Sequence, residues 1–142
     1  MDNDLLPVGA IAPEDPRRFE VRVAGPASML VSKLYKLHER VGAPDRLSDK
    51  DAHDVFRILV GTDPEDFERR YRRLLADPVS HDTAVVALGY LKELFAVGPE
   101  AVGSMMAGRA EAGVGEPETV ARQVALLAAE VVEVLRGAAD DW

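Results

Sequence analysis

Residues 27–41 read ASMLVSKLYKLHERV, and the spacing of their apolar side chains predicts an amphipathic helix. Four apolar residues recur at intervals of three or four positions and so share one helical face: Leu30, Leu34, Leu37 and Val41. Pro26 suits the first turn of this helix, where its missing N–H would have no partner. Gly42 and Pro44 predict where the helix ends.

The same kind of pattern continues toward the C-terminus and predicts further helices. Ser48, with Asp51 three residues later, resembles a capping box, so the second helix is expected to begin at Ser48. Three more amphipathic helices and one short helix are predicted over residues 64–77, 80–95, 102–106 and 117–135.

Upstream of these helices, residues 18–24 read RFEVRVA and alternate between polar and apolar, as in a half-buried strand. No second strand is predicted, so this one lacks a partner for its backbone hydrogen bonds. We predict a mainly α fold, with one N-terminal strand followed by five or six helices in a compact antiparallel bundle. Residues 1–16 are expected to form an arm and residues 17–142 a single helical domain. The unpaired strand predicts self-association, or binding of a second protein chain, through residues 18–24.

Composition excludes several classes of protein. The chain has 142 residues, no cysteine and a formal net charge of −8. Disulfides, thiolate zinc sites and cysteine nucleophiles are therefore excluded, and the acidic balance argues against a general nucleic-acid coat protein. No apolar run approaches the roughly 20 residues of a membrane span, and the first ten residues do not read as a signal peptide. We expect an acidic, cytoplasmic protein that has no membrane partner.

Charge is distributed unevenly along the chain. Residues 16–76 carry 13 basic and 10 acidic side chains, whereas residues 77–142 carry 4 basic and 11 acidic ones. An anionic ligand is therefore expected to bind the middle of the chain.

Five charged side chains in this middle region are the candidate functional residues. Lys33, Lys36 and Arg40 form a narrow stripe beside the apolar face of their helix. Asp51 and Asp54 fall within the apolar arc of the next helix, so both carboxylates are predicted to be buried against cations. Two interpretations stay open. The five side chains form an interhelical ion-pair network, or the cations bind an anionic ligand.

Part of this arrangement resembles a known family. Lys33, Arg40 seven positions later, and KDAHD at residues 50–54 are similar to two motifs of the AbiEii-type nucleotidyltransferases, toxins of abortive-infection and toxin–antitoxin systems. The similarity covers roughly residues 16–62, under half of the chain. Because the catalytic motif of the family is not found upstream of it, the chain resembles only the C-terminal half of such a protein. The resemblance implies that Lys33 and Arg40 contact nucleotide phosphates, with Asp51 and Asp54 as supporting carboxylates. Lys36 shares the cationic face and is included in the predicted phosphate site.

The catalytic motif of that family, a Gly-Ser turn followed by an Asp-x-Asp pair that holds Mg²⁺, is absent before residue 16. A similar spacing occurs at Gly103 and Ser104, with Glu116 and Glu118 downstream. These residues lie in helical sequence and come after the other motifs in the chain, so they are not taken as the catalytic motif. We assign no catalytic residue and no metal ligand, and the chain is expected to be inactive alone. A nucleoside triphosphate with Mg²⁺ is expected only if another chain supplies the catalytic half.

A second basic cluster lies at residues 69–73: Arg69, Arg70, Arg72 and Arg73. It is either the solvated face of a helix or a phosphate-contact patch for RNA. The sequence thus leaves two functional hypotheses. The chain is a nucleotidyltransferase-like half that binds a nucleotide or phosphate, or it is a non-catalytic helical protein-interaction module whose charges are structural ion pairs.

Overall fold

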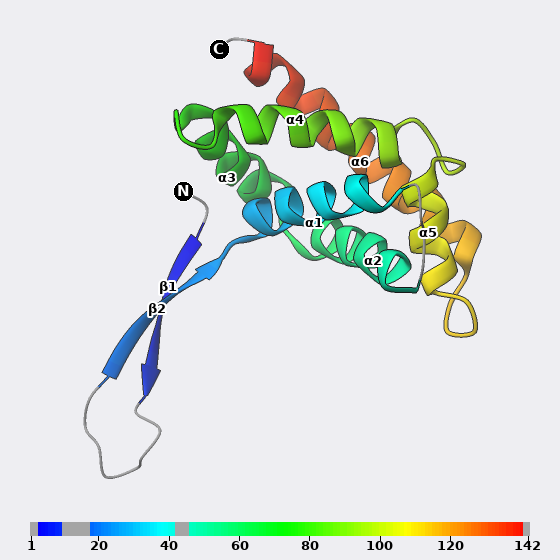
Figure 1. The fold of residues 1–142 in the computed structure, drawn as a ribbon, viewed down its shortest axis with the longest axis horizontal. Helices are drawn as coiled ribbons and strands as arrows, with labels where there is room; N and C mark the ends of the chain where they lie inside the picture. Colours follow the sequence, from blue (N-terminus) through cyan, green and yellow to red (C-terminus); the bar gives the residue numbers. More distant parts are fainter. Residues whose placement is uncertain (1–2, 10–17, 42–45, 141–142) are drawn as a thin grey trace.

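The structure is a computed structural model that describes residues 3–9, 18–41 and 46–140. The chain is mainly helical, which confirms the predicted class (Figure 1). In chain order its elements are β1 (Asn3–Gly9), β2 (Arg18–Ala24), α1 (Pro26–Arg40), α2 (Arg46–Gly61), α3 (Pro64–Ala76), α4 (His81–Leu91), the π-helical turn η1 (Lys92–Ala96), α5 (Val102–Ala110) and α6 (Pro117–Asp140).

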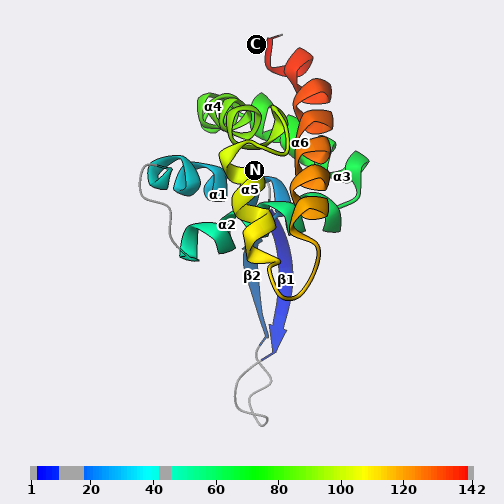
Figure 2. The same ribbon diagram turned by 90° about the vertical axis from the view of Figure 1, so that its right-hand side faces the viewer.

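The helices form a bundle in which α6 contacts α2, α3, α4, α5 and η1. Figure 1 shows α1 between α2 and α4, with α3 at one end of the bundle. At the other end, α5 packs against both α2 and α6. Figure 2 shows α6 running along the bundle next to α3. This arrangement leaves the α1–α2 contact and the α3–α6 contact on different parts of the surface.

The N-terminal strands form a two-stranded antiparallel hairpin that extends away from the helices (Figure 1). The register runs from Asn3 opposite Ala24 to Gly9 opposite Arg18. The expectation of a single strand with no partner is therefore wrong, because part of the predicted arm, residues 3–9, supplies the missing ladder. The sequence did not show this because NDLLPVG has no regular alternation and contains a proline.

The second helix begins earlier than predicted. α2 starts at Arg46, so Ser48 lies within the first turn, fully buried, and not at the N-cap position. The predicted capping box is therefore wrong. As a consequence, Asp51 is not held at the helix terminus and can face α1.

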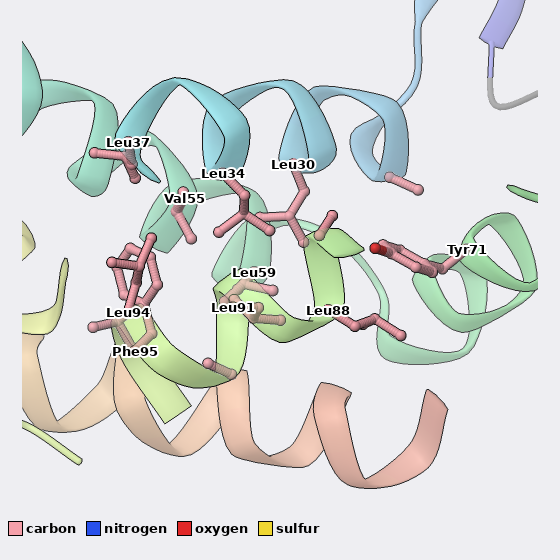
Figure 3. Close-up of a cluster of buried hydrophobic side chains, with 14 of the residues drawn as sticks. Leu30, Leu34, Leu37, Val55, Leu59, Tyr71, Leu88, Leu91, Leu94 and Phe95 are labelled. Carbon is pink, nitrogen blue, oxygen red and sulfur yellow. The ribbon is translucent and has the colours of Figure 1, made fainter. Parts of the chain in front are cut away.

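The core contains side chains from all six α-helices and from η1, and Figure 3 shows the part of it around Leu34, Leu91 and Phe95. The predicted α1 stripe is buried at Leu30, Leu34 and Leu37. Burial of apolar side chains at this spacing is the main force that holds an amphipathic helix of this length in place. It also fixes the rotation of α1, and thereby the direction in which its flanking cations point.

Tyr71 is the one large core side chain with a polar tip among the residues shown in Figure 3. Its ring is fully buried, its hydroxyl donates a 2.7 Å hydrogen bond to the Ala84 carbonyl, and burial raises the pKa of Tyr71 far above its ordinary value. We expect Tyr71→Phe to lower the free energy of unfolding by about 1–2 kcal/mol, because the buried hydrogen bond to the Ala84 carbonyl is lost. Tyr35→Phe is the matched control. Its hydroxyl lies 3.4 Å from the Thr83 carbonyl at an exposed position.

Urea denaturation followed by circular dichroism measures both substitutions. The control should change the free energy of unfolding by less than about 0.5 kcal/mol. Equal effects of the two substitutions would contradict the assignment of a buried, stabilising hydroxyl to Tyr71.

Candidate functional site

The predicted cations lie on the flank of α1 that faces α2. Because Leu30, Leu34 and Leu37 bury the adjacent face, Lys33 and its neighbours extend along the edge of the core. On α2, Ala52 and Val55 are fully buried against the core, which places Asp51 at the helix–helix boundary. The two apolar stripes therefore bring the charged groups of both helices together.

We call these five side chains the α1–α2 charge cluster: Lys33, Lys36, Arg40, Asp51 and Asp54. The Nζ atom of Lys33 lies 2.9 Å from Asp51 Oδ1 and 3.0 Å from Asp54 Oδ2, so it bridges both carboxylates. Lys36 Nζ lies 3.3 Å, and Arg40 Nη1 3.6 Å, from the second oxygen of Asp51. Asp51 thus contacts all three predicted cations.

The two carboxylates differ in how far they are buried. The side chain of Asp51 is only 6% exposed, whereas that of Asp54 is 27% exposed and its ion pair is with Lys33. The prediction that both carboxylates are buried is therefore right for Asp51 and wrong for Asp54. The reason is position: Asp54 lies one turn further along α2, beside a solvent-open hollow.

The electrostatics of the cluster favour the charged forms of Asp51 and Lys33. Burial is the largest influence on Asp51 and would by itself raise its pKa, but the hydrogen bond from Lys33 and the adjacent Lys36 outweigh it. The pKa of Asp51 therefore lies below its ordinary value. Hydrogen bonds to Asp51 and Asp54 raise the pKa of Lys33 above its ordinary value. Both groups stay charged at neutral pH.

The other face of α2 makes two further side-chain contacts that the sequence did not predict. Asp49 accepts two hydrogen bonds from Arg109, at 2.8 and 3.2 Å. One turn later, His53 Nε2 lies 2.5 Å from Glu111 Oε1. The first pair links α2 to α5, and the second links α2 to Glu111, the residue after the end of α5. The partners are 58 and 60 positions apart in the chain, so no local spacing could have indicated them.

The arginine cluster of α3 is largely paired within its own helix. Arg69 and Arg70 both contact Asp66, the latter at 3.0 Å, and Arg72 Nη2 lies 2.8 Å from Glu68 Oε1. Pairs at this spacing are the usual pattern of a solvated helix face. Contact of these arginines, or of Arg73, with RNA stays a prediction.

The rejected Gly-Ser pair has a packing role. Gly103 approaches the backbone of η1 closely, and the Ser104 hydroxyl donates a 3.1 Å hydrogen bond to the Phe95 carbonyl. Glu116 and Glu118 lie at the start of α6, around Pro117. These positions agree with a structural use of the segment.

An apolar recess, the α3–α6 groove, lies between the end of α2, the start of α3 and the second half of α6. Its cavity volume is about 280 Å³. Its apolar lining includes Leu59, Phe67, Leu127, Val131, Val134 and Leu135. Three glutamates also line it: Glu65, Glu68 and Glu130.

Comparison with known proteins adds no relative: no family model, no curated protein and no solved structure matches this chain. Over the residues that the structure describes, no group of three or more acidic or histidine side chains is placed to hold a metal ion. In the same residues, no helix is long and apolar enough to cross a bilayer. The similarity to AbiEii-type nucleotidyltransferases therefore stays a prediction.

Proposed function

We propose that this chain is a non-catalytic helical protein-interaction module, in which the α1–α2 charge cluster is a structural ion-pair network. The observation that carries the proposal is the position of Asp51. Its buried carboxylate contacts Lys33, Lys36 and Arg40, the three side chains predicted for phosphate binding.

The distances explain why this favours structure over ligand binding. A phosphate that bound Lys33 would compete with two carboxylate oxygens at 2.9 and 3.0 Å from the same nitrogen. It would also approach the negative charges of Asp51 and Asp54, which repel it. Cations that are already neutralised gain little from an added anion, because the attraction of one charge and the repulsion of the other nearly cancel.

One observation favours phosphate binding as a second candidate. Lys36 and Arg40 remain 45% and 38% exposed, and the cluster has three cations for two carboxylates. On this view Lys33, Lys36 and Arg40 bind a nucleotide, and a second chain supplies the Mg²⁺ ligands and the catalytic half.

Association through residues 18–24 was predicted because that strand had no partner in the chain. Since β1 pairs with β2, this reason no longer applies.

A titration with Mg²⁺-free ATP at low salt, followed by backbone amide chemical shifts, separates the two candidates. We expect no saturable shift in α1 up to about 10 mM ATP, because Asp51 and Asp54 already compensate most of the positive charge and repel the phosphates. Inorganic phosphate is the parallel probe for simple anion binding.

Saturable shifts near about 1 mM that weaken with added salt would overturn the proposal in favour of the phosphate site. In that case Arg40→Gln should abolish binding. Arg73→Gln, at an exposed position on α3, is the matched control and should leave binding unchanged.

A further inference from the structure

We infer that the α3–α6 groove is the docking site of this module and that it accepts a basic amphipathic helix of a partner protein. The inference rests on the proposed function and adds the surface and the chemistry of the partner. Three properties of the groove support it: a preformed apolar floor, an acidic rim with uncompensated charge, and a size suited to side chains.

The floor of the groove belongs to the core and is therefore fixed before a partner arrives. Leu59, Phe67 and Leu135 line it while being buried by their own neighbours. Val134, one residue before Leu135, is 47% exposed at the groove. When another apolar surface covers apolar side chains that are open to solvent, the free energy falls, and a rigid floor loses little conformational freedom in the process.

The rim determines the charge of the partner. Glu65 and Glu130 have no ion pair within the part of the chain that the structure describes, whereas Glu68 pairs with Arg72 at 2.8 Å. A neutral apolar partner would dehydrate these carboxylates without giving them a counter-charge, which is costly. Lysine or arginine side chains on both sides of an apolar ridge would supply that counter-charge.

The volume of the groove, about 280 Å³, is close to the lower end of the roughly 300–1,000 Å³ range of ligand pockets and leaves room for a few apolar side chains. An amphipathic helix that enters a groove presents apolar residues at positions i, i+3 or i+4, and i+7, and these fill a recess of this kind. With cations beside these anchors, such a helix matches both the floor and the rim.

The test uses the full chain and a synthetic peptide of about 14 residues, roughly four helical turns, in which leucines form one face and lysines the other. A peptide of the same composition in scrambled order, and one with glutamate in place of lysine, are the controls. Amide chemical shifts locate the binding surface and calorimetry measures the affinity. We expect the leucine–lysine peptide alone to bind, with shifts centred on α3 and the second half of α6.

Two substitutions with matched controls localise this binding. Val134→Lys should weaken it about tenfold or more, because it places a charge in the groove. Leu126→Lys, on the same helix but outside the groove and 65% exposed, should change it less than twofold. Glu130→Lys should likewise weaken binding, and Glu133→Lys, which changes the net charge equally outside the groove, should not.

Equal effects of each substitution and its control, or shifts that lie outside α3 and α6, would overturn the groove as the docking site. Equal binding of the glutamate peptide would overturn the acidic rim as the selecting feature. These results are independent of the ATP titration, which tests the α1–α2 charge cluster. A failed groove with no ATP binding therefore leaves the proposed function standing, whereas ATP binding rejects that function whatever the peptide does.

Discussion

Asp51→Asn is expected to lower the free energy of unfolding by about 2–4 kcal/mol, because it leaves three cations without their shared counter-ion. The substitution keeps the volume of the side chain, so the loss reports charge and hydrogen bonding and not a cavity. Lys33 would retain Asp54, and the partly exposed Lys36 and Arg40 can turn toward water. These adjustments place the expected loss below the largest values seen for broken buried pairs.

Asp54→Asn is the matched control on the same helix. Its side chain is 27% exposed and pairs with Lys33, which keeps a second partner in Asp51. We expect a loss below about 1 kcal/mol, typical of partly exposed pairs. Urea denaturation at neutral pH measures both variants. Similar losses, or a loss below about 0.5 kcal/mol for Asp51→Asn, would show that the cluster is solvated.

The pH dependence provides an internal check on the same variant. Since the folded protein lowers the pKa of Asp51, its carboxylate contributes stability above about pH 4, the ordinary range of an aspartate. This contribution is lost as the pH falls through the lower folded pKa. The wild-type protein should therefore lose more stability than Asp51→Asn on acidification below pH 4, and the two should converge at low pH.

The sequence predicts the α1–α2 charge cluster well because both of its determinants are local. The leucine stripe of α1 sets the direction of Lys33, and the stripe of α2 sets that of Asp51. A short connection then brings the two helices together. The burial of Asp54 was overestimated because an angular position on a helix does not reveal how closely the neighbouring helix covers it, and Asp54 lines an open hollow between α1 and α2.

Other features depend on contacts between distant parts of the chain and could not be predicted. The pairing of Asp49 with Arg109 follows from the docking of α5 on α2, which no spacing within either helix encodes. The α3–α6 groove arises where the apolar stripes of α3 and α6 do not fully cover each other. Val131 and Leu135 fit the period of a core face, yet both also line the groove. Periodicity distinguishes apolar from polar faces, but it does not distinguish a covered apolar face from an open one.

The contact between α5 and η1 is the second place where a small substitution should have a large effect on stability. A Cβ atom at Gly103 would lie 2.6 Å from the Leu94 carbonyl oxygen and 2.7 Å from the ring of Phe95. Neither neighbour can retreat easily, because one is helix backbone and the other a fully buried ring. Ser104, the next residue, hydrogen-bonds to the Phe95 carbonyl, so a shift of α5 would also strain that bond.

We therefore expect Gly103→Ala to lower the free energy of unfolding by about 2–3 kcal/mol, within the range of overpacked cores. Gly89→Ala is the matched control, since Gly89 is an exposed helical glycine of α4 with nothing within 4 Å of an added Cβ. Alanine restricts the unfolded chain and favours the helix there, so the control should stabilise the protein by about 0.5–1 kcal/mol. Opposite signs for the same chemical change, measured by thermal and urea denaturation, would show that close packing requires glycine at position 103. Stabilisation by both substitutions would mean that α5 lies further from η1 than the structure places it, and would remove the packing role assigned to the Gly103-Ser104 pair.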